Sequence, residues 1–186
     1  MTHIRIQTLS AAVLVGVLTL SAAAPASADT GSAPTSPGAA KVISDIDDIV
    51  SGMSDLESAT NKVTNLISAL AVQSTATKLS RTIEDSTTDA REAGKLDQAS
   101  SDALVRQATT LVAQTTTTTQ ALKAKEPEFR RLGLDPTMED SIARLARETM
   151  RLDDTLGSEV TNDDKAAIQA ASRSIDTDFQ SALSTF

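Results

Sequence analysis

The sequence has no cysteine, tryptophan or tyrosine, and its only histidine is His3. His3 lies in an N-terminal segment that we expect to be removed, which leaves the rest of the chain without imidazole or thiol groups. These groups are frequent nucleophiles and general acids or bases near neutral pH. Without cysteine there can be no disulfide, so stability must come from an apolar core. The absences favour packing and binding over catalysis.

The N-terminal segment has the pattern of a secretory signal peptide. Arg5 lies in a short polar start, an apolar stretch follows from Ile6 to Leu20, and Ala26–Ala28 has the small-x-small pattern of a cleavage site. The alternative is a transmembrane anchor, which needs roughly 20 consecutive apolar residues. Because the apolar stretch is shorter and ends at a cleavage pattern, we predict a signal peptide over residues 1–28 and a secreted protein.

The chain is acidic, with 17 basic and 25 acidic side chains and a formal net charge of −8. No basic stripe is present to meet phosphates, which argues against a nucleic-acid partner. The same balance argues against adsorption to anionic membranes.

Catalytic and metal-binding candidates are few. Three acidic pairs occur, at Asp47-Asp48, Asp153-Asp154 and Asp163-Asp164. Adjacent residues on a helix do not face each other, so these pairs make poor catalytic dyads. Their usual place is a solvated helix face or the first turn of a helix. The spacing of an EF-hand calcium loop is also absent. We therefore expect neither enzymatic activity nor a metal or other cofactor.

The remaining sequence divides into a leader and one domain. Residues 29–39 are rich in Gly, Pro, Ser and Thr and predict a flexible leader. From residue 40 to residue 186, apolar residues recur every three or four positions, which is the period of an amphipathic helix. No window alternates as a strand does. The pattern predicts a single all-α domain over residues 40–186.

Turn signals divide this domain into five helices. The first follows an apolar seam from Val42 to Leu70, with Gly52 as a possible break. The second extends from about residue 74 to residue 93, where Gly94 ends it. The third extends from about residue 100 to residue 125 and is expected to end at Pro127.

The last two helices have clear start signals. Asp135 is a candidate N-cap followed by Pro136 at the first helical position, and Gly157 is expected to close that helix. The fifth helix opens at Thr161 and continues to Phe186. Short links favour antiparallel neighbours, which predicts a five-helix antiparallel, up-and-down bundle. A long extended coiled coil is the alternative, and the four turn signals weigh against it.

The pattern resembles the fungal hydrophobic surface-binding protein A family, also called the cell-wall galactomannoprotein family. The residues that carry the resemblance are Val42–Ile49 after a secretory signal, Lys123–Phe129, Leu152–Leu156, and Phe179 with Phe186. It covers roughly residues 41–186 and rests on helix order and composition, because no single motif is specific. The resemblance implies a secreted or wall-associated helical protein. It also implies either fatty-acid binding inside the bundle or adsorption to hydrophobic surfaces in support of a polyester-degrading enzyme.

Small residues in the seams leave two possibilities for the interior. Alanines at positions such as 76, 90, 108, 171 and 182 stand where a packed bundle often has leucine. Either the helices approach closely and fill the space, or a dry apolar cavity remains that accepts an apolar guest. The predicted lining of such a cavity is Leu79, Ile83, Leu104, Leu111, Ile142, Leu145, Ile175 and Phe179.

Four hydroxyl residues interrupt the apolar seams, namely Thr60, Ser86, Thr115 and Thr149. With the helix bounds predicted above, these four residues fall at similar distances from one end of the bundle. One interpretation is that each hydroxyl bonds back to a carbonyl of its own helix. The other is a polar layer that binds a water or a lipid head group.

Two non-enzymatic functions therefore remain. The first is a carrier that encloses a fatty acid or a similar amphiphile, stabilised by burial of acyl methylenes at about 0.8 kcal/mol each. The second is a surface-active adhesion protein that coats a hydrophobic solid surface and recruits a secreted hydrolase. They differ in where the apolar area lies, inside the bundle or on its surface.

Overall fold

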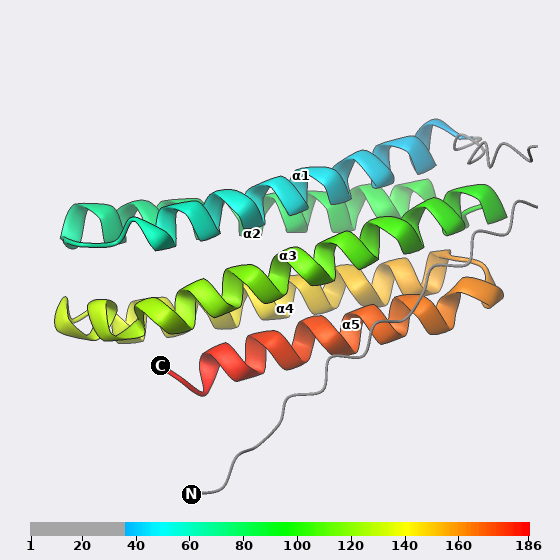
Figure 1. Ribbon diagram of the computed structural model, residues 1–186. Helices are drawn as coiled ribbons and strands as arrows, with labels where there is room; N and C mark the ends of the chain where they lie inside the picture. The colour runs from blue at the N-terminus through cyan, green and yellow to red at the C-terminus, as the bar shows by residue number, and fades with distance from the viewer. Residues whose placement is uncertain (1–35) are drawn as a thin grey trace, which may run out of the picture. The chain divides into compact units, whose positions relative to one another are not determined.

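The computed structural model describes residues 36–186, which form five α-helices (Figure 1). No strand occurs in this range, so the predicted all-α, five-helix fold is confirmed. The predicted signal peptide, and the leader as far as residue 35, lie outside the described residues. The helices are α1 (Pro37–Asn61), α2 (Leu66–Ala93), α3 (Gln98–Arg131), α4 (Asp135–Glu159) and α5 (Asn162–Leu183).

The five helices form a closed ring around one interior. Each helix packs mainly against two others, in the ring order α1, α2, α4, α5, α3 and back to α1. Short links make consecutive helices antiparallel, so α1, α3 and α5 point one way and α2 and α4 the other. Figure 1 shows α1, α3 and α5 side by side in one layer, with α2 and α4 behind them. All five helices therefore contribute side chains to a shared core.

The core is a single cluster with residues from every helix. The seam predicted for the first helix is buried at Val42, Ile46, Ile49, Met53 and Leu56, each at most 2% exposed. In the described range, none of the helices combines the length and the hydropathy that a membrane span requires. Packing of the core side chains within the ring stabilises the fold.

The first helix ends at Asn61, and not at Leu70 as the seam predicted. A link follows, and Asn65 starts α2 with a reciprocal capping box. Its side chain accepts from Ser68 N at 3.0 Å, and Ser68 Oγ accepts from Asn65 N at 3.1 Å. The apolar residues keep the same helical spacing across this link, so the periodicity gave no sign that α1 ends at Asn61. The sequence signal that marks the start of α2 is Asn65 with Ser68 three residues later.

Gly52 does not break α1. A Cβ at this position would lie 2.9 Å from Leu79 Cδ1 on α2. The absence of a side chain therefore lets α1 and α2 approach closely at this level. The residue that resembled a helix break is a packing contact between neighbouring helices.

The third helix continues through Pro127 to Arg131, contrary to the prediction. Proline inside a helix removes one backbone hydrogen bond and costs about 3 kcal/mol. Phe129 is fully buried two residues later, and its ring lies 6.0 Å from that of Phe186. Burial of a phenylalanine contributes about 1.5–3 kcal/mol, which offsets most of the cost of the proline. Tertiary packing therefore compensates for the local preference.

The remaining bounds differ by a few residues. Pro37, inside the predicted leader, starts α1, and Ser36 Oγ accepts from Ala39 N at 3.1 Å as its N-cap. The N-cap of α4 is Leu134, so Asp135 lies in the first turn, where its carboxylate pairs with Arg130 at 3.1 Å. Gly157 does not end α4, which continues to Glu159. Gly94 ends α2, and α5 follows Thr161, as predicted.

Two glycines provide opposite expectations for substitution by alanine. Gly94 has φ 65° and ψ −152°, a region that only glycine adopts readily. We expect Gly94→Ala to lower the free energy of unfolding by about 1–3 kcal/mol. Gly157 lies inside α4 with no atom within 4 Å of an added Cβ, so Gly157→Ala is expected to raise it by about 0.5–1 kcal/mol. Urea denaturation of both variants measures the difference, and equal effects would contradict the assignment.

Candidate ligand-binding site

The eight apolar residues predicted to line a cavity all lie in the core. Each is at most 3% exposed, and α2, α3, α4 and α5 contribute two each. They do not all surround the same space. Leu104, Leu111 and Ile175 line an apolar cavity, whereas the other five pack elsewhere in the cluster.

The apolar cavity lies between α1, α3, α4 and α5. Its full lining is Ile46, Leu104, Ala108, Leu111, Asp153, Leu156, Ile168, Ala171 and Ile175. Ala108 and Ala171 are two of the small seam residues that suggested a gap. The volume open to a water-sized molecule is only about 10 Å³, enough for at most one water. Pockets that hold small molecules usually measure about 300–1,000 Å³, so the helices must separate to admit an acyl chain.

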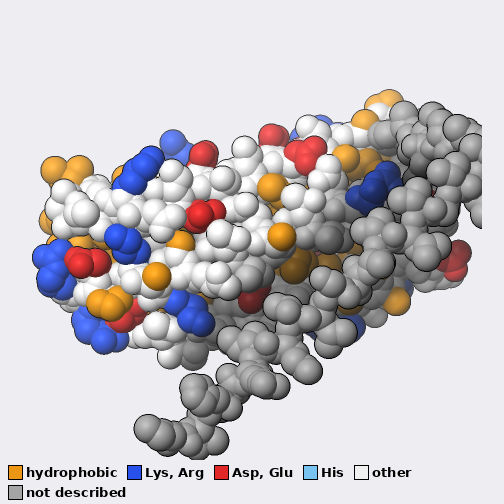
Figure 2. Space-filling model, in the orientation of Figure 1, with side chains coloured by type: hydrophobic (Ala, Val, Ile, Leu, Met, Phe, Trp, Pro, Cys, Tyr) orange, Lys and Arg blue, Asp and Glu red, His pale blue; other side chains and the backbone are white. Residues whose placement is uncertain are grey.

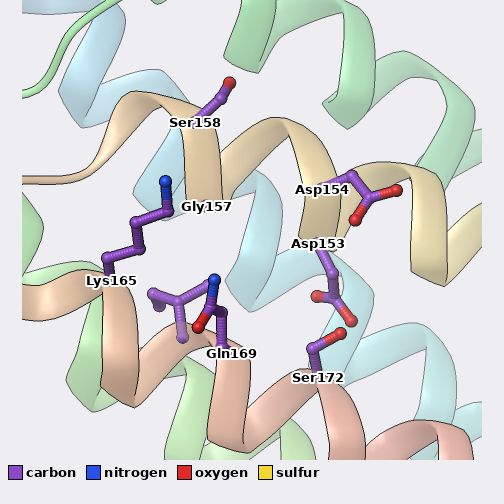
Figure 3. A pocket seen from close by; sticks show the side chains of 8 residues that line it. Asp153, Asp154, Gly157, Ser158, Lys165, Gln169 and Ser172 are labelled. Carbon is purple, nitrogen blue, oxygen red and sulfur yellow. The ribbon is translucent and has the colours of Figure 1, made fainter.

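A polar groove lies beside this cavity, where the end of α4 meets the start of α5 (Figure 3). It has a volume of about 220 Å³ and is open to solvent. Its lining is Asp153, Asp154, Gly157, Ser158, Lys165, Ile168, Gln169 and Ser172. Lys165 is the only cationic side chain in that lining.

Asp153 lines both the groove and the cavity, as does Ile168. Asp153 belongs to the inward face of α4 together with Thr149, one turn earlier, and Leu156, and it is only 9% exposed. Its neighbour Asp154 is exposed. The expectation that this acidic pair lies on a solvated helix face is therefore wrong for Asp153. The sequence signal that could have indicated its burial is its position one helical turn after Thr149, which belongs to the predicted buried face.

Burial raises the pKa of the Asp153 carboxyl to about 7. A hydrogen bond with the Ser172 hydroxyl, which points toward the carboxyl in Figure 3, lowers the pKa and partly offsets the loss of hydration. The charge of Asp154 adds a smaller rise. Oδ2 of Asp153 has no hydrogen-bond partner. The boundary between groove and cavity thus holds a carboxyl group that changes charge near neutral pH.

The four predicted hydroxyl residues are buried, but they do not form one layer. Thr60 lies at the link between α1 and α2, whereas Ser86 lies 20 residues beyond Leu66, about 30 Å along α2. Thr60 and Ser86 donate to carbonyls of their own helices, at 2.7 Å to Leu56 O and 2.7 Å to Thr82 O. The single layer was wrong because it assumed that the first helix ended at Leu70.

Thr115 and Thr149 behave differently. Their Oγ1 atoms are buried without a hydrogen-bond partner. Thr115 lies one turn after Leu111 on α3, and Thr149 lies one turn before Asp153 on α4, so both continue helix faces that line the cavity. A buried hydroxyl without a partner costs about 1–3 kcal/mol. The interior therefore has unsatisfied polar atoms near its apolar cavity.

Comparison with known families identifies the chain. The profile of hydrophobic surface binding protein A, HsbA, matches residues 39–158, which cover four helices and most of the domain. The chain belongs to the HsbA family. The resemblance noted in the sequence is thereby confirmed. Among curated proteins, none matches this HsbA-family chain.

Solved structures share the fold of this HsbA-family member. A crystal structure of AFMP4P in complex with palmitic acid is 28% identical with a TM-score of 0.77, covering 79% of this chain and 98% of that one. Ligand binding domain 1 of the Penicillium marneffei MP1 protein, complexed with arachidonic acids, is 14% identical with a TM-score of 0.73; the coverages are 76% and 93%. Domain 2 of the same protein, also with arachidonic acids, is 16% identical with a TM-score of 0.72, covering 83% and 95%.

Proposed function

We propose that this protein is a secreted, non-enzymatic carrier that holds a fatty acid-like amphiphile inside its helical ring. The observation that carries the proposal is the continuity of a polar groove with an apolar cavity through Asp153. An amphiphile needs both environments, one for its head group and one for its chain. The complexes of the structural neighbours with palmitic and arachidonic acids support this choice of ligand.

The acyl chain would enter between α4 and α5 and displace the side chains around the cavity. Each buried methylene contributes about 0.8 kcal/mol, which offsets the cost of separating helices that are closely packed without the ligand. Ala108 and Ala171 leave the least bulk in the path. Leu104, Leu111 and Ile175 would then contact the chain, in agreement with three of the eight residues predicted from the sequence.

The head group would occupy the groove. The Lys165 ammonium attracts a carboxylate, and the Gln169 amide provides hydrogen-bond donors. Asp153 donates to the ligand carboxyl when protonated and repels it when ionised. The unsatisfied hydroxyls of Thr115 and Thr149 would accept or donate to a second amphiphile or a water that accompanies the chain.

Secretion, attachment to a cell wall and a hydrolase partner stay predictions from the signal-peptide pattern and from the family. The surface-active alternative also stays a prediction. It requires an apolar area on the outside of the molecule, whereas the site proposed here lies inside the ring.

Native mass spectrometry with palmitate tests the proposed site. We expect about one adduct per chain and a higher melting temperature, because a ligand that binds only the folded state stabilises it. Ala171→Leu fills the space in the cavity and is expected to weaken binding at least tenfold. Ala76→Leu is the matched control, because Ala76 is a buried seam residue on α2 outside the cavity lining.

Both substitutions add the same number of atoms, but Ala76 is buried whereas Ala171 is partly buried, so Ala76→Leu is expected to cost at least as much stability, about 1–3 kcal/mol. Equal loss of binding in the two would show that overpacking in general, and not the cavity, limits binding. Retention of full affinity in Ala171→Leu would place the acyl chain elsewhere.

A further inference from the structure

Two threonines in the interior of the ring differ from the other buried threonines in their hydrogen bonding. Seven threonines of the described chain are buried. Five of them donate to the carbonyl four residues earlier at 2.7–2.9 Å, namely Thr60, Thr87, Thr118, Thr119 and Thr155. Thr115 and Thr149 do not, although they lie inside helices where that bond is available, and they are 0% and 1% exposed. These two hydroxyls therefore need a partner that the described residues do not provide.

The high threonine content of α3 does not account for this difference. Thr109, Thr110 and Thr117 on the same helix are exposed, and Figure 2 shows the middle of the face formed by α1 and α3 as a largely uncharged polar surface. A hydroxyl on that face forms hydrogen bonds with water, whereas Thr115 and Thr149 are withdrawn from water. The two interior hydroxyls are thus neither hydrated like the exposed threonines nor bonded to their own helices like the other buried ones.

The two interior threonines lie in the middle of helix faces that are otherwise mostly apolar. On α3, the threonine lies one turn after the cavity residue Leu111 and two turns before the buried Leu122. On α4, it lies one turn from the buried Leu145 and one turn from Asp153, which borders the groove. Both helices pack against α5, so the two faces flank the same part of the ring. A path inward from the groove therefore passes the apolar cavity, then the threonines, and then apolar side chains again.

We propose that these two hydroxyls bind an oxygen atom on the acyl chain itself, so that the preferred ligand is a fatty acid with a hydroxyl at mid-chain. This inference rests on the carrier function proposed above and names the class of amphiphile. A saturated chain leaves Thr115 and Thr149 to a water or a second amphiphile. A chain hydroxyl both donates and accepts, so it pairs with a threonine hydroxyl in either direction. The apolar residues before and after the threonines then contact the methylenes on the two sides of the chain oxygen.

Buried polar groups of this kind discriminate between ligands. A ligand that leaves them unpaired binds less well than one that satisfies them. Neither threonine belongs to the lining of the small cavity, so a ligand reaches them only with the part of its chain that extends inward from the groove. The position of the hydroxyl along the chain should therefore determine the affinity.

Competition measured by native mass spectrometry tests this preference with the full chain. Stearate and a stearate hydroxylated at mid-chain are added together, and their adducts differ by the mass of one oxygen atom. We expect the mid-chain hydroxystearate to bind about tenfold more tightly than stearate. Stearate hydroxylated next to its carboxyl group should bind only as well as stearate, because that hydroxyl stays in the groove.

Valine substitutions remove the hydroxyls and keep the shape of the side chains. In the double variant Thr115→Val, Thr149→Val, the two stearates should bind within about twofold of each other. Thr60→Val is the matched control, because Thr60 is equally buried but donates to Leu56 O at 2.7 Å. It should retain the tenfold preference. Since the double variant loses only hydroxyls without partners, its melting temperature should not fall below that of the wild type, which verifies that it folds.

The outcomes separate this inference from the carrier function. Equal binding of stearate and mid-chain hydroxystearate to the wild type would overturn the inference and leave the carrier function intact. Equal weakening of both ligands in the double variant would also overturn it, because the threonines would then contact the carboxyl head group. Absence of adducts with every acid would overturn the carrier function, and the inference with it.

Discussion

Replacing Asp153 by asparagine is expected to stabilise the protein at pH 8 and to have little effect near pH 4. Burial raises the pKa of this carboxyl from 3.8 to about 7. Ionisation of the native state is therefore unfavourable relative to ionisation of the unfolded chain. One pKa unit corresponds to about 1.4 kcal/mol, so the full difference amounts to at most about 4 kcal/mol. Asparagine retains the shape and the hydrogen bonding and removes the charge.

The direction of the pH dependence follows from proton binding. Between pH 4 and pH 7 the folded state binds the Asp153 proton more tightly than the unfolded state does. The contribution of Asp153 to stability is therefore complete below pH 4, falls as the pH rises, and levels off above pH 7. The difference in free energy of unfolding between Asp153→Asn and wild type should grow over that interval.

Thermal unfolding at several pH values measures this difference. For a domain of this size, 1 kcal/mol shifts the melting temperature by roughly 2–4 °C, so an increase of several degrees is expected at pH 8. Asp154→Asn is the matched control, because Asp154 is adjacent but exposed. Similar stabilisation by both variants would contradict a special role for burial.

The same pair of variants tests the head-group proposal. Ionised Asp153 repels a fatty-acid carboxylate, so wild-type affinity for palmitate is expected to fall as the pH rises through about 7. Asp153→Asn should remove that fall, whereas Asp154→Asn should retain it. If the pH dependence persists in Asp153→Asn, the head group lies away from Asp153.

Periodicity predicted the helices well, because a helix buries one face and its apolar residues repeat accordingly. It could not find the end of α1, since Val63 is buried in the link and keeps the spacing in phase. It also could not show that α3 passes Pro127, because burial of Phe129 depends on contacts distant in sequence. Local sequence signals correctly predicted the end of α2 at Gly94 and the start of α5 after Thr161.

The candidate site was predicted in part. The eight apolar residues were correctly placed in the core, but the sequence could not determine which of them surround the cavity. That depends on the ring order, in which α3 contacts α5 and α2 contacts α4. Asp153 was assigned to a solvated face because acidic residues are seldom buried. The predicted hydroxyl layer was wrong because the position of each hydroxyl along the bundle was counted from a predicted helix end, and the first helix ends at Asn61.

Truncation of Leu104 is expected to have the largest effect on both stability and binding. Leu104 is fully buried and lines the apolar cavity. Leu104→Ala should lower the free energy of unfolding by about 2–5 kcal/mol without ligand, or roughly 4–20 °C in melting temperature. The substitution enlarges a space that the acyl chain must otherwise open by moving side chains. Palmitate should therefore bind more tightly and recover more stability than in the wild type.

Leu56→Ala provides the comparison for this prediction. Leu56 is 1% exposed on α1 and lies outside the cavity lining, so its truncation removes the same atoms from another part of the core. Both variants should lose similar stability without ligand, whereas only Leu104→Ala should show a larger palmitate-induced rise in melting temperature. An equal rise in melting temperature would indicate that palmitate stabilises any bundle whose core has been loosened, wherever the truncation lies. A smaller rise in Leu104→Ala would mean that Leu104 stabilises the bound chain, because the acyl chain would then lose contacts and gain no space.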